Sequence, residues 1–148
     1  MTNRTEVINK TIAAIEKAAP ERVEMSYFVS SDNRCNTAAC IAGWVFLANT
    51  PKTEPIYNVS DTVLGLLNIS VDQEDKLFFM VEDNNEVQTA LIAAGAKSGF
   101  NYRGNLSSFD ALASEVRKRA AINVLTILRD TDKVDWPTAI TEAVKAKA

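Results

Sequence analysis

Two cysteines are the most reactive side chains of this chain. Cys35 and Cys40 stand five positions apart, at the start of a run without charged residues. If Thr37 is the N-cap of a helix, Cys40 occupies about its third position, where the helix dipole lowers the pKa of a thiol. The spacing therefore raises three questions: thiol catalysis, disulfide formation and metal binding.

The chain lacks the groups that most of this chemistry needs. It contains no histidine, so Cys-His and Ser-His catalysis are excluded, and the Cys-x-x-Cys spacing of zinc sites is missing. A disulfide needs Cα atoms within about 7 Å, whereas five helical residues rise about 7.5 Å, so it can form only if Cys35 lies outside the helix. We favour two reduced thiols in a structural core. We expect no metal, no cofactor and no enzymatic activity.

Two other motifs imitate ligand sites. Gly95–Gly99 contains glycine, lysine and serine but lacks the glycine that directly precedes the lysine of a phosphate-binding loop. Asp130–Asp135 begins like a calcium loop, yet Val134 occupies a ligand position and Asp135 replaces the turn glycine. The end of one helix, followed by an Asp135 cap on the next, explains that segment better.

The best candidate for recognition is an irregular segment rich in glycine and asparagine, which we expect to be an ordered loop or a mobile flap. Its cations offer donors to an anion, and its aromatic rings offer faces for stacking. The alternative is an ordinary connection whose aromatic rings pack in the core. The segment runs from Lys97 to Asn105 and carries Lys97, Phe100, Tyr102 and Arg103, while Arg34 ends a second candidate segment.

The elements that must position these residues are mostly helical. Ala38–Ala48 has no polar side chain, so a helix there must be wrapped on every side by the rest of the protein. Trp44 lies in its middle and is expected to be a core anchor. Asn49-Thr50-Pro51 ends this helix, because the residue before a proline is pushed out of the helical region.

Six further helices follow from apolar spacing and capping residues. Residues 22–29 alternate like a strand but have no evident partner, so we expect at most a short extended segment there. The expected helices cover 5–19, a short helix capped by Ser60, one opened by the Ser70-x-x-Gln73 capping box, one from Asn84 or Asn85 to Gly95, one from Ser107 or Ser108 to about Arg129, and one capped by Asp135.

Composition limits the class of protein. With 148 residues the chain fits a single domain, 1–148, and the predicted fold is a mostly α helical bundle of about six or seven helices around the central apolar helix. A net charge of −3 provides no basic surface for nucleic acid. We find neither a secretory signal nor a membrane span, and we expect a cytoplasmic protein.

Several short motifs together resemble a set of small uncharacterised proteins from bacteriophages and bacteria. Those proteins share a Cys-Gly-Thr-x-x-Cys-Ile-Ala-Gly-Trp motif, a later Leu-Gly-Leu, a Leu-Phe and a closing Asp-Trp. This chain departs at Asn36, where the pattern has glycine, and Lys97–Asn105 looks like an insertion. The matching segments here are Val23–Phe28, Cys35–Trp44, Leu64-Gly65-Leu66, Leu77-Phe78, Val124-Leu125 and Val134-Asp135-Trp136.

The resemblance implies a phage or bacterial accessory protein with a helical core, and it brings no catalytic residues. Our first expectation is a non-enzymatic protein that acts by contact with a host or phage protein, with a homodimer among the assemblies open to it. The alternative is a small-molecule-binding protein that sequesters a nucleotide-derived signal in an anti-defence role. In that case Lys97–Asn105 would lie over the pocket.

Overall fold

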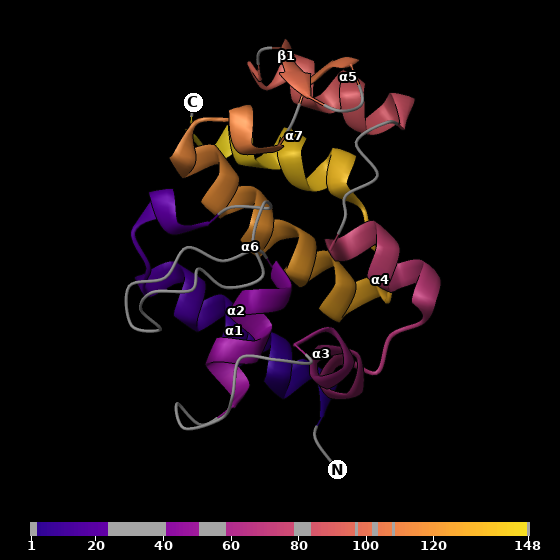
Figure 1. Ribbon diagram of the computed structural model, residues 1–148. Coiled ribbons are helices and arrows are strands. Elements are labelled where there is room, and N and C mark those ends of the chain that lie inside the picture. Colours follow the sequence, from indigo (N-terminus) through magenta and orange to yellow (C-terminus); the bar gives the residue numbers. More distant parts are fainter. Residues whose placement is uncertain are drawn as a thin grey trace.

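Helices make up most of the part of the chain that the structure, a computed structural model, describes: residues 3–23, 41–50, 59–78, 84–96, 98–101, 104–107 and 109–147 (Figure 1). The predicted mostly α fold is confirmed. The elements in order are α1 (Arg4–Lys17), η1 (Pro20–Arg22), α2 (Ile41–Asn49), α3 (Val59–Leu67), α4 (Val71–Phe78), α5 (Asn85–Ala93), β1 (Ser98–Asn101), β2 (Gly104–Ser107), η2 (Phe109–Ala111), α6 (Ser114–Thr131) and α7 (Trp136–Lys147).

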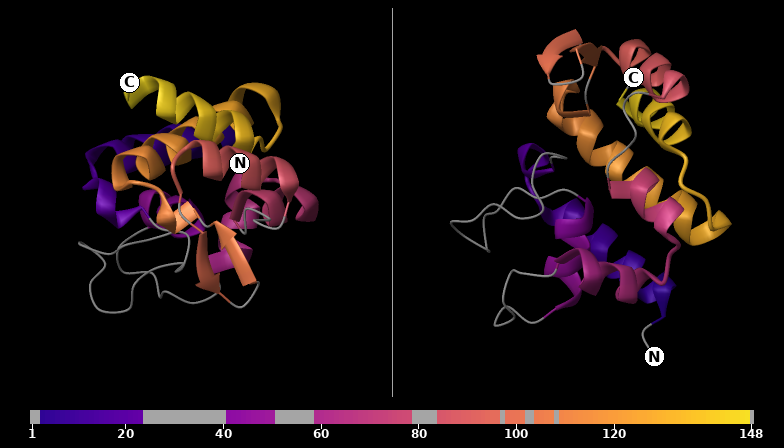
Figure 2. Two further views of the ribbon diagram at one scale, coloured as in Figure 1. Left: turned by 90° about the horizontal axis from the view of Figure 1, so that it is seen from above. Right: turned by 45° about the vertical axis from the view of Figure 1, so that its right-hand side comes forward.

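Helix α6 lies in the middle of the described fold and packs on α1 at one side and on α7 at the other (Figures 1 and 2). Helices α2 and α3 pack on α1, and α5 packs on α7. The hairpin of β1 and β2 lies against α5. Among the described helices, none has both the length and the apolar composition needed to cross a membrane.

The apolar helix is buried as predicted. Every residue of α2 from Ile41 to Phe46 is buried, and Trp44 keeps only 9% of its surface exposed. The helix ends where expected, because Asn49 Nδ2 donates to Val45 O (2.9 Å) and Thr50 Oγ1 donates to Phe46 O (2.6 Å). The predicted cap Thr37 and the two cysteines lie outside the described residues.

Three of the predicted helix caps are confirmed. Gln73 N donates to Ser70 Oγ (3.1 Å) and Ser70 N to Gln73 Oε1 (2.9 Å), so the predicted capping box opens α4. Asn84 Oδ1 accepts from the amide of Glu86 (2.8 Å) at the start of α5. Asp135 Oδ1 accepts from Thr138 N (3.1 Å) at the start of α7.

Three basic residues of α6 bind backbone or side-chain oxygens of neighbouring elements instead of extending into solvent. Lys118 Nζ donates to the carbonyls of Glu16 (2.7 Å) and Ala18 (2.9 Å), at the C-terminal end of α1, where helical carbonyls lack partners. Arg117 Nε donates to Val23 O (2.8 Å). Arg129 Nη1 donates in the same way to Asn9 Oδ1 of α1 (2.8 Å).

The segment expected to be a loop or flap is a hairpin instead. Strands β1 and β2 pair antiparallel, with Ser98 opposite Ser107 and Asn101 opposite Gly104, around a connection at 102–103. Strand pairing uses backbone groups, so the glycines and asparagines that indicated a loop do not prevent it. Among the described residues, paired strands are therefore found at 98–101 and 104–107. Of the extended segment expected at 22–29, all residues after Val23 lie outside the described part.

Two predicted helix starts were wrong. Helix α6 begins at Ser114 and not at Ser107 or Ser108, because the chain first forms η2, where Phe109 is buried, and Ala113 has a non-helical ψ of 141°. Helix α3 begins at Val59, one residue before the predicted cap Ser60. In the first case buried packing, which the local sequence does not reveal, outweighed a good capping residue.

Asp132, at the C-terminal end of α6, connects the start of α4 with the first residue of α1. This residue ends α6 in the left-handed region, with φ 60°. Its carboxylate lies 2.7 Å from Arg4 Nη1, and Gln73 Nε2 donates to both its carbonyl (2.8 Å) and its Oδ1 (3.2 Å). The hydrogen bond from Gln73, followed by that from Arg4, lowers the pKa of Asp132 below its ordinary value.

Trp44 can be tested by two substitutions. Trp44→Ala should lower the free energy of unfolding by about 3–5 kcal/mol, because it opens a cavity in the core. Trp44→Phe should cost less than about 1.5 kcal/mol, since the buried Nε1–H has no acceptor within the described part of the chain. Urea denaturation measures both values. Equal losses in the two variants would contradict this account.

The Asp132 junction predicts a dependence on pH. A lowered folded-state pKa means that this carboxylate stabilises the fold above its unfolded pKa, about 3.9, and that the contribution disappears as the pH falls through the folded value. Asp132→Asn should therefore lower the thermal midpoint modestly at pH 7, and the difference from wild type should shrink as the pH falls below about 4. Asparagine tolerates the left-handed conformation, so the variant isolates the charge. A difference that stays constant across this range would contradict the prediction.

Candidate functional site

Most of the predicted binding residues cannot be placed. Arg34, Lys97, Tyr102 and Arg103 lie outside the described residues, as do Cys35 and Cys40. The backbone of Phe100 lies in β1, paired with Asn105. The structure therefore does not test a binding role for this group, and it remains a prediction.

A pocket of about 350 Å³ lies where the C-terminal end of α4 meets the N-terminal ends of α5 and α7. We call it the Trp136 pocket. Apolar residues of α5, of the turn between α6 and α7, and of the start of α7 form part of the lining. Charged residues from α4, α5 and the same turn complete it. The lining residues are Lys76, Asn84, Glu86, Val87, Lys133, Val134, Asp135, Trp136 and Pro137.

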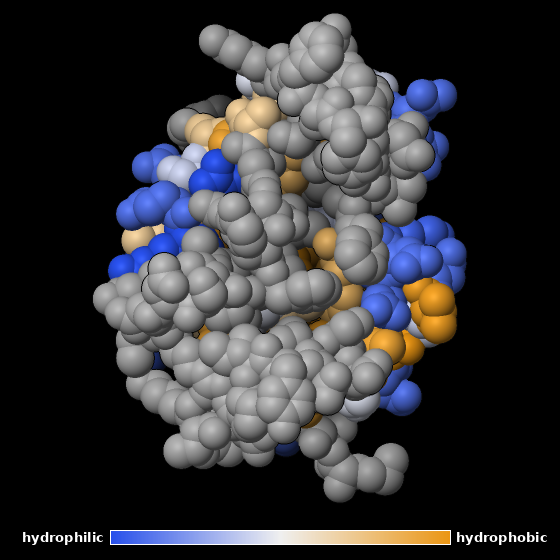
Figure 3. Space-filling model, viewed as in Figure 1, coloured by the Kyte–Doolittle hydropathy of each residue, from blue (hydrophilic) through white to orange (hydrophobic). Residues whose placement is uncertain are grey.

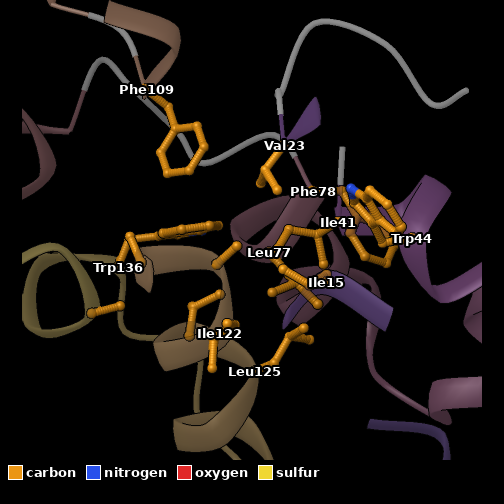
Figure 4. Close-up of a cluster of buried hydrophobic side chains, with 14 of the residues drawn as sticks. Ile15, Val23, Ile41, Trp44, Leu77, Phe78, Phe109, Ile122, Leu125 and Trp136 are labelled. Carbon is orange, nitrogen blue, oxygen red and sulfur yellow. The ribbon is translucent and has the colours of Figure 1, made fainter. Parts of the chain in front are cut away.

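Trp136 holds the parts of this pocket together. Its side chain is 2% exposed, and its Nε1 donates to the carbonyl of Lys76 (2.8 Å), one of the α4 carbonyls without a partner inside the helix. The ring meets Phe109 edge to face, with centroids 5.3 Å apart (Figure 4). The hydrogen bond thus joins Trp136 to the residue that directly precedes Leu77-Phe78.

The hydrogen bonds of the fold already use several polar groups of the pocket. Both carboxylate oxygens of Asp135 bind Thr138, one accepting from its amide (3.1 Å) and the other from its hydroxyl (2.8 Å). The Oδ1 atom of Asn84 accepts from the first turn of α5. Lys76 Nζ lies 3.0 Å from Asp72 Oδ2, but both side chains are more than half exposed, so this pair is weak.

An exposed apolar area lies at the junction of α3 and α4. Val71 is 69% exposed, and Leu66 and Ile69 are partly exposed beside it in the sequence. Figure 3 shows apolar surface at the right-hand side over α4, next to strongly hydrophilic surface. Helical spacing places Glu74 and Asp75 one turn beyond Val71. We call these five residues the α4 corner.

A second hollow lies between α6 and α7, and most of its described lining residues are polar. Its volume is about 500 Å³, and Arg119 lines it together with Glu115 and Glu142. Asn123, another lining residue, binds the carbonyl of Ala139 across the two helices (3.1 Å). One cation and two carboxylates line the hollow, so its described side chains carry a net negative charge and indicate no ligand class.

Sequence reasoning did not single out the α4 corner or the Trp136 pocket. An apolar residue directly after the capping serine, among acidic neighbours, is a signal that could have indicated Val71. The pocket gave no such signal, because it depends on the contact of Trp136 with a carbonyl 60 positions earlier. Comparisons with models of protein families, with curated proteins and with solved structures found no match.

The bond from Trp136 to Lys76 predicts different effects for the two tryptophans. Trp136→Phe removes the donor and leaves a carbonyl at the end of α4 without its partner, so it should cost about 1–2 kcal/mol more than Trp44→Phe. Urea denaturation of both variants under identical conditions measures the difference. Equal costs would show that the bond adds little to stability.

Proposed function

We propose that this chain is a non-enzymatic accessory protein, of phage or bacterial origin, that acts in the cytoplasm by contacting another protein. The α4 corner is the proposed contact surface. The exposure of Val71 is the observation that supports it most, because Val71 is 69% exposed and follows the partly exposed Leu66 and Ile69 in the sequence, and grouped apolar surface marks interaction sites.

The charges of the corner favour a different protein over a second copy of this chain. In a symmetric dimer the same surface patch meets itself, so the interface would bring together two copies of the acidic side of the corner, at Asp75. Like charges facing each other at an interface oppose association. A partner with a basic, partly apolar segment offers the matching charge, while its apolar side chains cover Val71.

A second candidate function is the binding of a small molecule. The Trp136 pocket supports it, because 350 Å³ falls within the range of ligand sites and the wall combines apolar and charged groups. This site differs from the expected one at Lys97–Asn105. Native mass spectrometry of freshly purified protein tests it, since the method reports a co-purified ligand and the oligomeric state together. Failure to find a ligand, together with no thermal shift across a panel of small organic anions and nucleotides, would count against this function.

The contact surface can be tested with a matched pair of substitutions. Val71→Glu should reduce the capture of a partner from lysate of the natural host by at least about tenfold, because it places a charge in the apolar centre of the contact. Ile92→Glu is the control, since Ile92 is 60% exposed on a different helix. Quantitative mass spectrometry of material bound to the wild-type chain and to both variants gives the ratios.

Two results would overturn the proposal. Equal capture by Val71→Glu and Ile92→Glu would show that the α4 corner is not the contact surface. A wild-type dimer in sedimentation experiments that Val71→Glu dissociates would assign the corner to a second copy of the chain. Thermal unfolding of both variants confirms that they are folded.

A further inference from the structure

Gly65 lies inside α3 at a position where the fold itself does not need a glycine. Val63 and Leu67 are buried, so Gly65, two positions from each, lies on the opposite, exposed face of the helix. Its φ is not positive, and the described residue near it that has a positive φ is Asn68 (50°), just after the helix. Gly95, by contrast, has φ 91°, a conformation that favours glycine.

The glycine at this position makes the chain less stable than alanine would. Inside a helix, glycine loses more backbone freedom on folding than alanine does. A Cβ atom on Gly65 would have no described atom within 4 Å, so crowding within this part of the chain does not exclude a side chain. Glycine also lets another backbone approach a helix closely. The position therefore indicates a close contact with a molecule outside the chain.

Gly65 is continuous with the α4 corner. It directly precedes Leu66, the first residue of the corner, and is itself exposed. A standard interface covers about 800 Å² on each partner, which is enough to include Gly65 together with Ile69 and Val71. A partner that covers the apolar side chains of the corner thus also reaches the position without a side chain.

The surface fits a helix better than an extended peptide. An added strand binds to unpaired backbone groups at the edge of a sheet, whereas α3 and α4 use most of their backbone groups within the helices. A helix satisfies its own backbone and needs only an apolar face to contact.

The charge of α4 sets the charge of that helix. This element has three carboxylates, Asp72, Glu74 and Asp75, and one cation, Lys76. Lys76 Nζ lies 3.0 Å from Asp72 Oδ2, while Asp75 is exposed and pairs with no cation in the described part of the chain. Basic side chains on the partner would therefore complement Asp75.

We propose that the α4 corner binds a basic amphipathic helix of another protein, and that this helix crosses α3 at Gly65. Its apolar side chains cover Leu66, Ile69 and Val71, and its lysine or arginine side chains lie at Asp75. Without a side chain at the crossing, the two helix axes can approach to the lower end of the usual range of about 8–10 Å. The inference rests on the first of the two proposed functions and adds the form of the partner.

Substitutions at Gly65 should affect stability and binding in opposite directions. Gly65→Ala should raise the thermal midpoint of the full chain by about 2–4 °C, because alanine is the better helix former. The same variant should retain about three- to tenfold less of the protein that the wild-type chain captures from lysate of the natural host, because the methyl group separates the two backbones. Gly65→Gln should reduce retention by at least about tenfold. Ala93→Gln is the control and should leave retention unchanged, since Ala93 is exposed on α5.

Carbodiimide cross-linking of the captured complex tests the form of the partner. The reagent joins a carboxylate directly to an amine, and mass spectrometry identifies the joined peptides. Asp75 should be joined to a lysine in a segment of the partner whose apolar residues recur at helical spacing. Asp75→Asn should remove this cross-link, because it removes the carboxylate.

The outcomes separate the inference from the function beneath it. An unchanged or lower thermal midpoint in Gly65→Ala would show that the fold requires this glycine and would overturn the inference. Full retention by Gly65→Gln, or an equal loss in Ala93→Gln, would overturn the crossing at Gly65 but leave the contact surface if Val71→Glu still loses the protein. A cross-linked segment without helical spacing would overturn the choice of a helix, and a cross-link to a second copy would overturn the choice of another protein. If the wild-type chain captures no protein that Val71→Glu loses, the first proposed function fails and the inference fails with it.

Discussion

The described fold depends on one constraint: α6 must be covered on two sides at once. Its buried residues face α1 in one direction and α7 in the other, and so the helix joins the two groups of elements on either side of it. Polar side chains along the helix reinforce both contacts. Lys118 binds the end of α1, and Asn123 binds a carbonyl within α7. Helices α2 and α3 pack on α1, and α5 packs on α7, so their positions follow from this arrangement.

Helix α4 packs on α2 and is held by hydrogen bonds near the C-terminal end of α6. With eight residues it is shorter than the lengths at which isolated helices are stable. Its start is held by the bond from Gln73 to Asp132 and its end by the bond from Trp136 to the Lys76 carbonyl. The first of these partners, Asp132, lies in the turn that joins α6 to α7, and the second, Trp136, is the first residue of α7. The position of α4 therefore follows from the end of α6.

Structural features that depend on interactions between neighbouring residues could be predicted from the sequence. The capping box at Ser70 and the caps at Asn84 and Asp135 involve residues two or three positions apart, and all three formed as predicted. The burial of α2 was also predictable, because a run without polar side chains has only one stable environment. Interactions between distant segments were not predictable. The hairpin, the late start of α6 and the Trp136 pocket depend on contacts that no local pattern encodes.

The two candidate surfaces lie at opposite ends of α4, for a common physical reason. The helix packs its last two residues, Leu77 and Phe78, into the core, while its first residue, Val71, remains at the surface. A short helix with only its end buried leaves exposed side chains at its start and unpaired carbonyls at its end. The exposed start forms the α4 corner. The carbonyl end attracts Trp136, and the space beside that indole is the pocket. One helix thus accounts for both surfaces.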